Sequence, residues 1–265
     1  MNAPEKAGLL PDIQSQPDGR NLPVHAVGVH GIRYPMTIDA GGGPFPTVAT
    51  LSLSVGLAGH VKGTHMSRFI ELLEARRGAL SPDSLRSVLF EMLERLGAWS
   101  GAIELSFPYF RPKTAPVSQV RSLLDYQVNW RAAVTEAGSY SFSMKVVVPA
   151  TSLCPCSKEI SDYGAHNQRS HIGIEAELAG DMTIDELIGV AERAASCEVY
   201  GLLKRPDEKY VTERAYDNPK FVEDLVRDVA LSLNGDDRIA AYVVEAENFE
   251  SIHNHSAFAR ITKRR

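Results

Sequence analysis

Residues 140–178 read Y-S-F-S-M-K-V-V-V-P-A-T-S-L-C-P-C-S-K-E-I-S-D-Y-G-A-H-N-Q-R-S-H-I-G-I-E-A-E-L. In this stretch, two strand-like runs are separated by a loop, and the fold prediction starts from this arrangement. An apolar run of β type at 143–148 leads in, and a polar-then-apolar run at 169–178 leads out. Such runs, bounded by Pro, Gly and Ser, are typical of strands joined by a loop. The stretch 151–171 between them holds two of the three cysteines and two of the eight histidines.

Strand and helix patterns follow the same order in both halves of the chain. In the first half, strands are predicted at 32–39, 47–57, 102–107 and 120–131, with helices at 66–76 and 82–96. In the second half, strands are predicted at 140–150, 169–178, 239–245 and 257–261, again with two helices. The helix-opening signals are Ser81 before Pro82, Thr183 three residues before Glu186, and Asn218 before Pro219. Two ββααββ units of this kind predict an α+β fold with antiparallel sheets and helices on one face.

This pattern divides the 265 residues into three parts. Residues 1–20 are polar and Pro-rich and are predicted to form a disordered arm, whereas 21–136 form the first module and 137–265 the second. A sheet of four strands leaves two edges with unpaired backbone groups. We therefore expect sheets of neighbouring units to close into barrels, which makes the protein an oligomer.

Composition and charge disfavour several classes of protein. The chain has no run of about 18 apolar residues, so no membrane-spanning helix is expected, and its first residues lack the apolar segment of a signal peptide. Three cysteines, two of them separated by one residue, do not form a disulfide framework, and the cytoplasm is the expected compartment. The net charge of −5 gives no reason to expect nucleic acid as a partner.

Two local groups of basic residues stand out against this acidic background. Lys62, His65 and Arg68 lie close together in the sequence, and so do Lys204 and Arg205 with Lys209. If they converge they can hold a polyanionic small molecule, because ammonium and guanidinium groups suit phosphate oxygens. The alternative is that each group is simply a solvated surface.

The loop at 151–171 combines ligands suited to a metal ion. Cys154, His166 and one carboxylate would form a set of three protein ligands that leaves a position for water, as in catalytic zinc sites. Cys154 and Cys156 lack the two-residue spacing of a zinc ribbon, so a closed structural site is not predicted. A metal-free reactive thiol and an inert buried loop remain open as alternatives.

Two further segments complete the list of candidates. In 245–255, His253 and His255 follow Glu250, and a histidine near a carboxylate there could serve as a general acid/base at neutral pH; the alternative is a surface histidine. Cys197 lies near a predicted helix end and is expected to be a small core residue.

Five long segments carry a resemblance to a known family. They are K-G-T-H-M-S-R-F at 62–69, T-S-L-C-P-C-S-K-E-I-S-D-Y-G-A-H-N-Q-R-S-H at 151–171, S-C-E-V-Y-G-L-L-K-R-P-D-E-K-Y-V-T-E at 196–213, N-P-K-F-V-E-D at 218–224 and E-N-F-E-S-I-H-N-H-S-A at 247–257. In these segments the chain resembles the prokaryotic type IB GTP cyclohydrolase I, from about residue 21 to residue 259. The resemblance implies a tunnelling fold with two ββααββ-type modules in one chain, a homotetramer of barrels, and active sites between subunits.

The resemblance also implies a reaction. Such enzymes are hydrolases of cyclic amidine C–N bonds that convert GTP and water to 7,8-dihydroneopterin triphosphate and formate. This is the first step of tetrahydrofolate biosynthesis and, in bacteria, supplies queuosine precursors. One divalent ion per active site is implied, with zinc, manganese or iron as the candidates.

Site residues follow from the resemblance position by position. Cys154 and His166 would be metal ligands with Glu208 as the third, and Glu223 would accept hydrogen bonds from the guanine. His253 would protonate N7 of the guanine while an activated water attacks C8, and Glu250 and Cys156 would support later steps. From charge and context alone, the triphosphate is assigned to a set of six residues: Lys62, His65, Ser67, Arg68, Lys204 and Arg205.

Two competing functions stay open at this point. One is a metal-free tunnelling-fold enzyme with a Cys nucleophile, such as an NADPH-dependent nitrile reductase, whose activity would survive chelation. The other is a metal-stabilised binding or scaffold protein, which would bind a divalent ion and leave GTP untouched.

Overall fold

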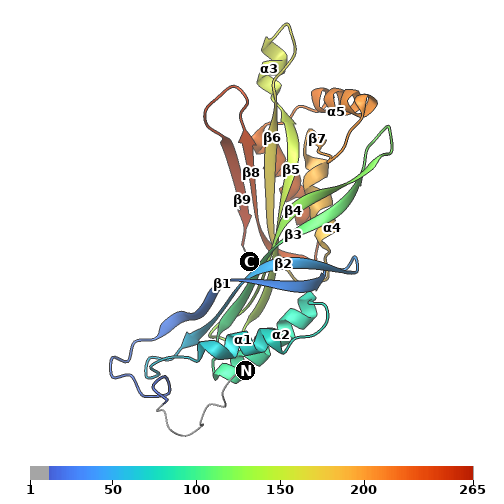
Figure 1. Cartoon of the computed structure of the whole chain (residues 1–265). Coiled ribbons are helices and arrows are strands. Elements are labelled where there is room, and N and C mark those ends of the chain that lie inside the picture. The colour runs from blue at the N-terminus through green and yellow to red at the C-terminus, as the bar shows by residue number, and fades with distance from the viewer. Residues whose placement is uncertain (1–11, 265) are drawn as a thin grey trace.

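The computed structural model describes residues 12–264, and one large antiparallel sheet organises them (Figure 1). The strands are β1 (Val24–Asp39), β2 (Pro44–Leu57), β3 (Gly101–Thr114), β4 (Arg121–Val134), β5 (Tyr140–Leu153), β6 (Asn167–Leu178), β7 (Cys197–Glu198), β8 (Ile239–Phe249) and β9 (Ala257–Lys263). The order is β1-β2-β3-β4-β5-β6-β8-β9, and the short β7 pairs with β5 beside this path. The predicted α+β class with an antiparallel sheet and helices is confirmed.

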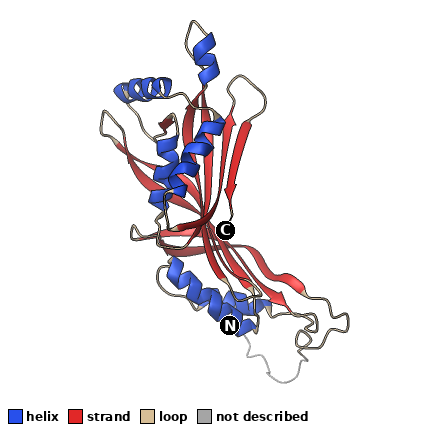
Figure 2. Cartoon of the chain, turned by 180° about the vertical axis from the view of Figure 1, so that it is seen from behind, coloured by secondary structure: helices blue, strands red, loops and turns tan. Residues whose placement is uncertain are grey.

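The described part of the chain forms six helices, and two pairs of them cover one face of this sheet. The six helices are α1 (Met66–Glu74), α2 (Pro82–Leu96), α3 (Pro155–Ile160), α4 (Ile184–Ala194), α5 (Arg205–Asp217) and α6 (Val222–Asn234). The pair α1 and α2 packs on the first four strands, and α4 and α6 pack on the later ones (Figure 2). Both helix pairs belong to one continuous apolar core.

The strand register shows that this core lies on a single face. Residues directly opposite each other on neighbouring strands share a face. One such row runs across six strands and is buried throughout: Leu51, Leu105, Trp130, Met144, Ala176 and Tyr242. The adjacent row points to the opposite face and is polar over most of its length: Ser52, Glu104, Arg131, Ser143 and Glu177. The sheet therefore has one apolar, helix-covered face and one polar, open face.

The helix-opening signals read from the sequence are confirmed at two positions. Ser81 accepts a hydrogen bond from the Ser84 backbone N–H and opens α2, with Pro82 as the first helical residue. Thr183 accepts from the Glu186 N–H, and the Glu186 carboxylate accepts from the Thr183 N–H in return. Each pair satisfies backbone donors that a helix start otherwise leaves free.

The predicted elements need correction in several places. The helix expected after Asn218 and Pro219 begins only at Val222, because Phe221 is the N-cap and Asp224 accepts its backbone N–H. The helices α3 and α5 and the strand β7 were absent from the prediction. Most strands also extend further than predicted, since several residues at their ends are polar and weaken the apolar pattern.

The junction between the two predicted modules falls at the turn between β4 and β5. These strands are hydrogen-bonded to each other from Gln127 opposite Val147 to Val134 opposite Tyr140, so a single sheet crosses the junction. Of the predicted arm, residues 1–11 lie outside the described residues, and from Asp12 onward the chain makes turns. Pro17 bridges to Val61, and the Asp18 N–H donates to the His60 carbonyl at 2.9 Å. Among residues 12–264, none of the helices is both long and apolar enough to cross a membrane.

Candidate active site

Pairing of β5 with β6 brings Cys154 and His166 together. The last pairs of the ladder are Ser152 opposite Gln168 and Leu153 opposite Asn167, so the next residue on each strand is Cys154 and His166. The Cys154 N–H donates to the His166 carbonyl at 3.2 Å, which continues this register beyond the strands. Both residues are half-buried. A thiol and an imidazole twelve positions apart in sequence therefore become neighbours at one end of the sheet.

The short helix α3 begins between the two cysteines of this loop and includes the second of them. Cys154 is the N-cap residue, Pro155 is the first helical residue, and the Ser157 hydroxyl donates to the Cys154 carbonyl at 3.1 Å. Cys154 is half-buried, whereas Cys156 lies on α3 and is exposed. The structure thus assigns the two thiols different surroundings, with Cys154 the one held beside His166.

The loop between β8 and β9 closes over the same end of the sheet. Ser251 in this loop lies 3.2 Å from Nδ1 of His166 through its hydroxyl oxygen. When Nδ1 carries the proton and donates to Ser251, the lone pair of Nε2 is left free for a ligand. The preceding residue, Glu250, accepts a hydrogen bond at 3.3 Å from the side-chain amide of Gln168. The strand order therefore joins the 151–171 and 245–255 segments, as the chemistry of the site requires.

His253 and His255 also belong to this loop. Their rings stack with centroids 5.0 Å apart and an interplanar angle of 15°, and both side chains are exposed. An exposed imidazole at the end of the sheet is open to a ligand.

Glu208 lies in the first turn of α5, and its neighbour Asp207 fixes this helix start. Asp207 is completely buried, with 0% of its side chain exposed. Its carboxylate accepts hydrogen bonds from the Lys204 N–H at 2.8 Å, the Val117 and Ser118 N–H groups at 2.8 Å each, and the Ser118 hydroxyl. Burial alone would raise the pKa of Asp207, but these donors outweigh it and hold the pKa well below its usual value.

The other end of α5 is attached to α3. The Lys158 ammonium donates to the Tyr216 carbonyl at 2.6 Å and lies 4.3 Å from the centre of the Tyr216 ring. Glu208 precedes Tyr216 by about 12 Å of helix axis. The start of α5, where Glu208 lies, is therefore held at the β3–β4 loop, and the end of α5 is held at α3.

The donors of the predicted metal site fit a divalent ion only in part. Cys154 and His166 are neighbours through a backbone hydrogen bond, and their thiol and imidazole are donor types that suit zinc and other borderline ions. Among residues 12–264, no three His, Cys, Asp or Glu side chains are gathered closely enough to hold a metal ion. Glu208 is exposed and is not assembled with the other two.

Glu223 is placed by the start of α6. The Lys220 N–H donates to the Leu153 carbonyl at 3.1 Å, which attaches the residues before α6 to the end of β5. Asn218 donates from its side-chain amide to the carbonyls of Ala195 and Ser196. Glu223 lies in the first turn of α6 and is exposed. The guanine-binding candidate therefore belongs to the same end of the molecule as Cys154.

The triphosphate candidates of the first half lie elsewhere. Lys62, His65, Ser67 and Arg68 surround the start of α1, at the opposite end of the chain from α3 and α5 (Figure 1). Lys62 donates to the Gln16 side chain at 3.3 Å, and Arg68 donates to the Arg95 carbonyl at 3.0 Å. A single chain does not bring this group to Cys154, whereas the exposed Lys204 and Arg205 lie at the start of α5.

A buried ion cluster positions the elements behind α5. Lys113 on β3 contacts Glu192 of α4 at 2.8 Å and also bonds Glu198 of β7. Burial and the neighbouring Glu192 carboxylate raise the pKa of Tyr126 far above its usual value, so its hydroxyl remains the donor to Glu192 at 2.8 Å. Arg214 of α5 lies 3.8 Å from Glu198. The β3–β4 hairpin, α4 and α5 are thereby linked through buried or half-buried charges.

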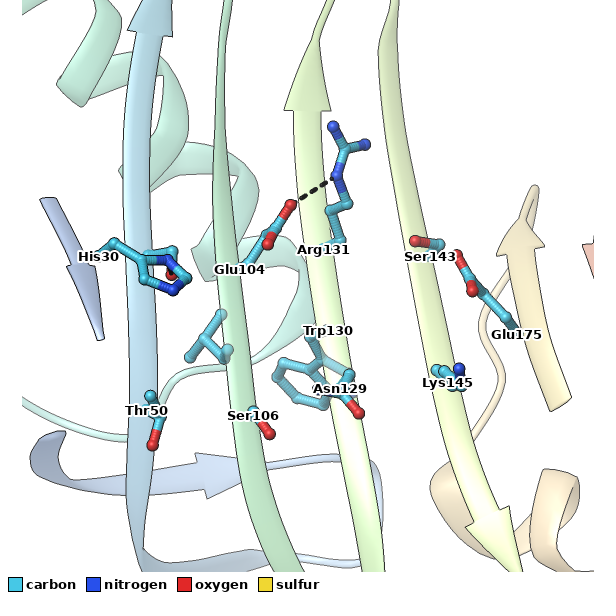
Figure 3. A pocket seen from close by; sticks show the side chains of 12 residues that line it. His30, Thr50, Glu104, Ser106, Asn129, Trp130, Arg131, Ser143, Lys145 and Glu175 are labelled. Carbon is cyan, nitrogen blue, oxygen red and sulfur yellow. Dashed lines mark hydrogen bonds and ion pairs between the residues drawn. The ribbon is translucent and has the colours of Figure 1, made fainter. Parts of the chain in front are cut away.

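A shallow depression of about 380 Å³ lies on the open face of the sheet, apart from these residues. Figure 3 shows side chains of neighbouring strands around it, with an ion pair of 3.0 Å between Glu104 and Arg131. His30 is one of its lining residues and lies 2.7 Å from the Ser52 hydroxyl. None of the predicted site residues lines this depression.

Four residues of the site were not singled out from the sequence: Asp207, Gln168, Ser251 and Lys158. Asp207 had a usable signal, because an acidic residue three positions after a helix-opening residue is typical of a helix start. The contacts of Gln168, Ser251 and Lys158 join segments far apart in the chain, and no local sequence pattern predicts them.

Comparison with known proteins identifies the family. The model described as type I GTP cyclohydrolase folE2 matches residues 10–259. The chain belongs to the type I GTP cyclohydrolase folE2 family. The prediction of type IB GTP cyclohydrolase I is corrected by this match and by relatives that carry the FolE2 name.

Curated relatives in this family match along almost their whole length. GTP cyclohydrolase FolE2 of Paraburkholderia xenovorans (strain LB400) is 60% identical over 264 residues, which cover 99% of this chain and 98% of the relative. GTP cyclohydrolase FolE2 of Cupriavidus necator is 59% identical over 263 residues, with the same coverage.

Solved structures of urate oxidases share the fold of this folE2-family chain. A hyperthermostable mutant of Bacillus sp. TB-90 urate oxidase has a TM-score of 0.52 at 10% identity and covers 91% of this chain and 98% of its own. Another structure of Bacillus sp. TB-90 urate oxidase also has a TM-score of 0.52 at 10% identity, with 91% and 100% covered. At this identity the likeness concerns the fold alone.

Proposed function

We propose that this chain is a GTP cyclohydrolase that converts GTP and water to 7,8-dihydroneopterin triphosphate and formate for folate biosynthesis. Membership of the folE2 family, with relatives about 60% identical over the full chain, carries this conclusion. The convergence of Cys154, His166 and the 250–255 loop at one end of the sheet supports it, since hydrolytic ring opening needs a nucleophile and a proton donor in one place.

Cys154 and His166 are the residues that would hold a divalent ion; the resemblance adds Glu208 as a third ligand, although this structure leaves Glu208 exposed and apart from the other two. Such an ion, when bound, supplies a water of lowered pKa at neutral pH. Ser251 orients the His166 ring through Nδ1, and Cys154 is fixed by its backbone bond to His166. Zinc, manganese and iron all suit a sulfur, nitrogen and oxygen ligand set.

The remaining residues act on the purine. Glu223 at the start of α6 would accept the parallel N–H groups of the guanine edge, which a carboxylate can do with both oxygens. His253, exposed in the 251–255 turn, would donate a proton to N7 as the imidazole ring opens. Glu250, held by Gln168, and Cys156 on α3 are the candidates for later proton transfers.

We further propose that the working enzyme is a homotetramer whose sheets close into barrels, each chain contributing two ββααββ-type modules with the boundary near residue 136. The sheet ends at β1 on one side and β9 on the other, and these edges carry exposed apolar side chains such as Val24 and Phe258. Unpaired edges of this length favour pairing with another copy. An assembly would also allow Lys62, His65, Ser67 and Arg68 of one copy to reach the triphosphate beside Lys204 and Arg205 of another.

We also propose that the protein is located in the cytoplasm, on the evidence of its cysteines. Cys154, Cys156 and Cys197 are all free thiols, which is the usual state of cysteines in a reducing compartment. GTP is the small-molecule partner, and the proposal includes neither a nucleic acid nor a membrane.

The test is incubation of the purified protein with GTP and Mn²⁺, Zn²⁺ or EDTA, followed by oxidation and measurement of pterin fluorescence. We expect fluorescence with a divalent ion and its loss with EDTA. Unchanged GTP in every condition would overturn the proposal in favour of a binding protein. Activity that survives EDTA and requires NADPH would indicate a metal-free reductase instead.

A further inference from the structure

The helix-covered face of the sheet changes from apolar to polar in ordered rows towards the candidate site. Register places Ala150, Ser170 and Asn248 in one row across β5, β6 and β8. In this row the Ser170 hydroxyl donates to the Asn248 side chain at 2.7 Å, and both residues are buried. In this row the two polar side chains bond to each other.

The next row towards the site consists of Ser152, Gln168 and Glu250. Ser152 pairs with Gln168, and Glu250 continues the β8 register that places Phe249 opposite Arg169. Cys154 and His166 follow one row further on, joined by their backbone hydrogen bond. Gln168 therefore lies directly between the core and the candidate ligands.

This row does not satisfy itself. Gln168 is 7% exposed and Ser152 is 0% exposed. Among residues 12–264, the buried Oε1 of Gln168 and the buried Oγ of Ser152 have no hydrogen-bond partner. A buried polar atom without a hydrogen bond lowers stability, and an apolar pair at these two positions would avoid this loss. Packing alone therefore gives no reason for a glutamine here. Rules of this kind are broken mainly where function requires it.

Gln168 donates a side-chain hydrogen bond from Nε2 to Oε1 of Glu250 at 3.3 Å. An amide carries no charge at any pH and donates through N–H, so it orients a carboxylate without neutralising it. The second carboxylate oxygen of Glu250 is then left for a reacting group. The free Oε1 of Gln168 is open to an N–H or O–H donor, from ordered water or from the substrate.

We propose that Gln168 is a positioning residue of the reaction, which holds the Glu250 carboxylate in place from the core side through its amide N–H. This rests on the proposed function, since Glu250 is taken to act in the conversion of GTP. Gln168 touches no reacting atom in this account, and its effect on turnover passes through Glu250.

A double-mutant cycle tests the proposal. Gln168→Met keeps the length of the side chain and removes both the donor and the unpaired oxygen. We expect kcat to fall about tenfold or more, as for loss of a hydrogen bond to a charged group. We expect KM and the metal content to change less than twofold and Tm to hold or rise. In a Glu250→Gln background, Gln168→Met should cause no further loss beyond twofold.

A matched control comes from the open face of the sheet. Gln127 on β4 is an exposed amide that donates to the Ser106 hydroxyl at 2.8 Å, and Gln127→Met should keep kcat within twofold. If Gln168→Met does not fold, Gln168→Asn carries the test, because its amide is one methylene too short to reach Glu250. Wild-type kcat in the Gln168 variants, or the same loss with and without Glu250, would overturn the proposal.

Unfolding equilibria of the same four proteins give a second cycle that needs no turnover. We expect the effects of Gln168→Met and Glu250→Gln on the unfolding constant to differ from additivity by more than twofold. Additive effects would contradict the proposed interaction between Gln168 and Glu250. A wild-type protein that leaves GTP unchanged would instead overturn the proposed function, and this second cycle would still report on Gln168 and Glu250.

Discussion

The two halves of the chain share a framework and differ in what is inserted into it. In each half, four long strands carry two helices on the same face, and a capping box opens a helix at Ser81 in one and Thr183 in the other. Between residues 12 and 136, the structure describes α1 and α2 and no other helix. The second half adds α3 between β5 and β6, and β7 and α5 between α4 and α6. The comparison shows that the framework supports the fold, that the insertions α3 and α5 carry Cys154, Cys156 and Glu208, and that the other second-half candidates lie on α6 and on the loops next to β6 and β8.

The ends of the sheet differ in the same way. In the first half, Phe45, Phe107 and Tyr109 pack on the helix-covered side with ring contacts of 5.2 and 6.3 Å, and beyond them on β3 the buried Lys113 is paired with Glu192. In the second half, the equivalent side ends in polar rows around Gln168 and Asn248. The buried polar group of the first half is closed by its own ion pair, whereas the row around Gln168 holds buried oxygens that have no partner within residues 12–264.

The largest difference between the halves should appear in turnover. His253→Ala should lower kcat by about 10²- to 10⁴-fold, the usual contribution of a positioned proton donor, and leave the bound metal in place. His25→Ala, on β1 of the first half, should leave kcat near that of the wild type. Formate release and metal analysis on each protein check this, and near-normal turnover by the His253 variant would remove it as the acid.

The shared framework predicts equal effects on stability. Leu89 in α2 and Leu225 in α6 are both completely buried in the common core. Replacing either with Ala should lower the free energy of unfolding by about 2–5 kcal/mol, from lost burial and the cavity left behind. Urea titration of the two variants measures this. A loss below 1 kcal/mol in one half alone would show that its helix is not part of the same core.

Asp207 should affect the insertion without affecting the framework. Asp207→Asn removes an acceptor of four donors and places an N–H group among them, which releases the start of α5 that carries Glu208. We expect the affinity for Mn²⁺ to fall about 10- to 100-fold, as for loss of a residue that orients a ligand. Calorimetric titration checks this, with Asp217→Asn at the exposed end of α5 as the control.

The same residue sets a pH dependence of stability. The pKa of Asp207 is lowered from its usual 3.8, so the folded state gains from the ionised carboxylate. This contribution is complete above about pH 5 and is lost as the pH falls through 3.8 towards the lowered folded value. Wild type should therefore exceed Asp207→Asn in stability most at neutral pH and least near pH 2. A difference that grows on acidification would contradict the assignment.

The smallest effect concerns the two helix caps. Ser81→Ala and Thr183→Ala should each cost about 0.5–2 kcal/mol, because each removes the acceptor of a backbone N–H at a helix start. Thermal unfolding of both variants measures this. Two similar values would support the common framework, and a negligible cost at either site would show that its cap is replaced by solvent.

The framework was largely predictable because its signals are local. The buried row through Leu51 and Met144 follows from alternation within single strands, and the caps follow from residues three positions apart. By contrast, α5 buries only Asp207 and Ala215, so no apolar stripe marks it as a helix. The helix α3 has six residues and β7 has two, which is too short for a periodic pattern.

The site was predictable in its residues and not in its contacts. Cys154 and His166 flank one loop, and pairing of the adjacent strands explains why they meet. Gln168 meets Glu250 only because β6 pairs with β8 across an intervening stretch of helices, which no local pattern encodes. The separation of Lys62 and Arg68 from Cys154 also depends on how the whole sheet is laid out.

The most direct test of the division between framework and insertion is a paired measurement on Cys154→Ala. Bound metal per chain and formate released from GTP are determined on the same preparation, alongside the Tm of the metal-free protein. We predict that metal and formate release both fall to background while the Tm of the metal-free protein stays at the wild-type value. Retention of both metal and turnover by Cys154→Ala would contradict the account.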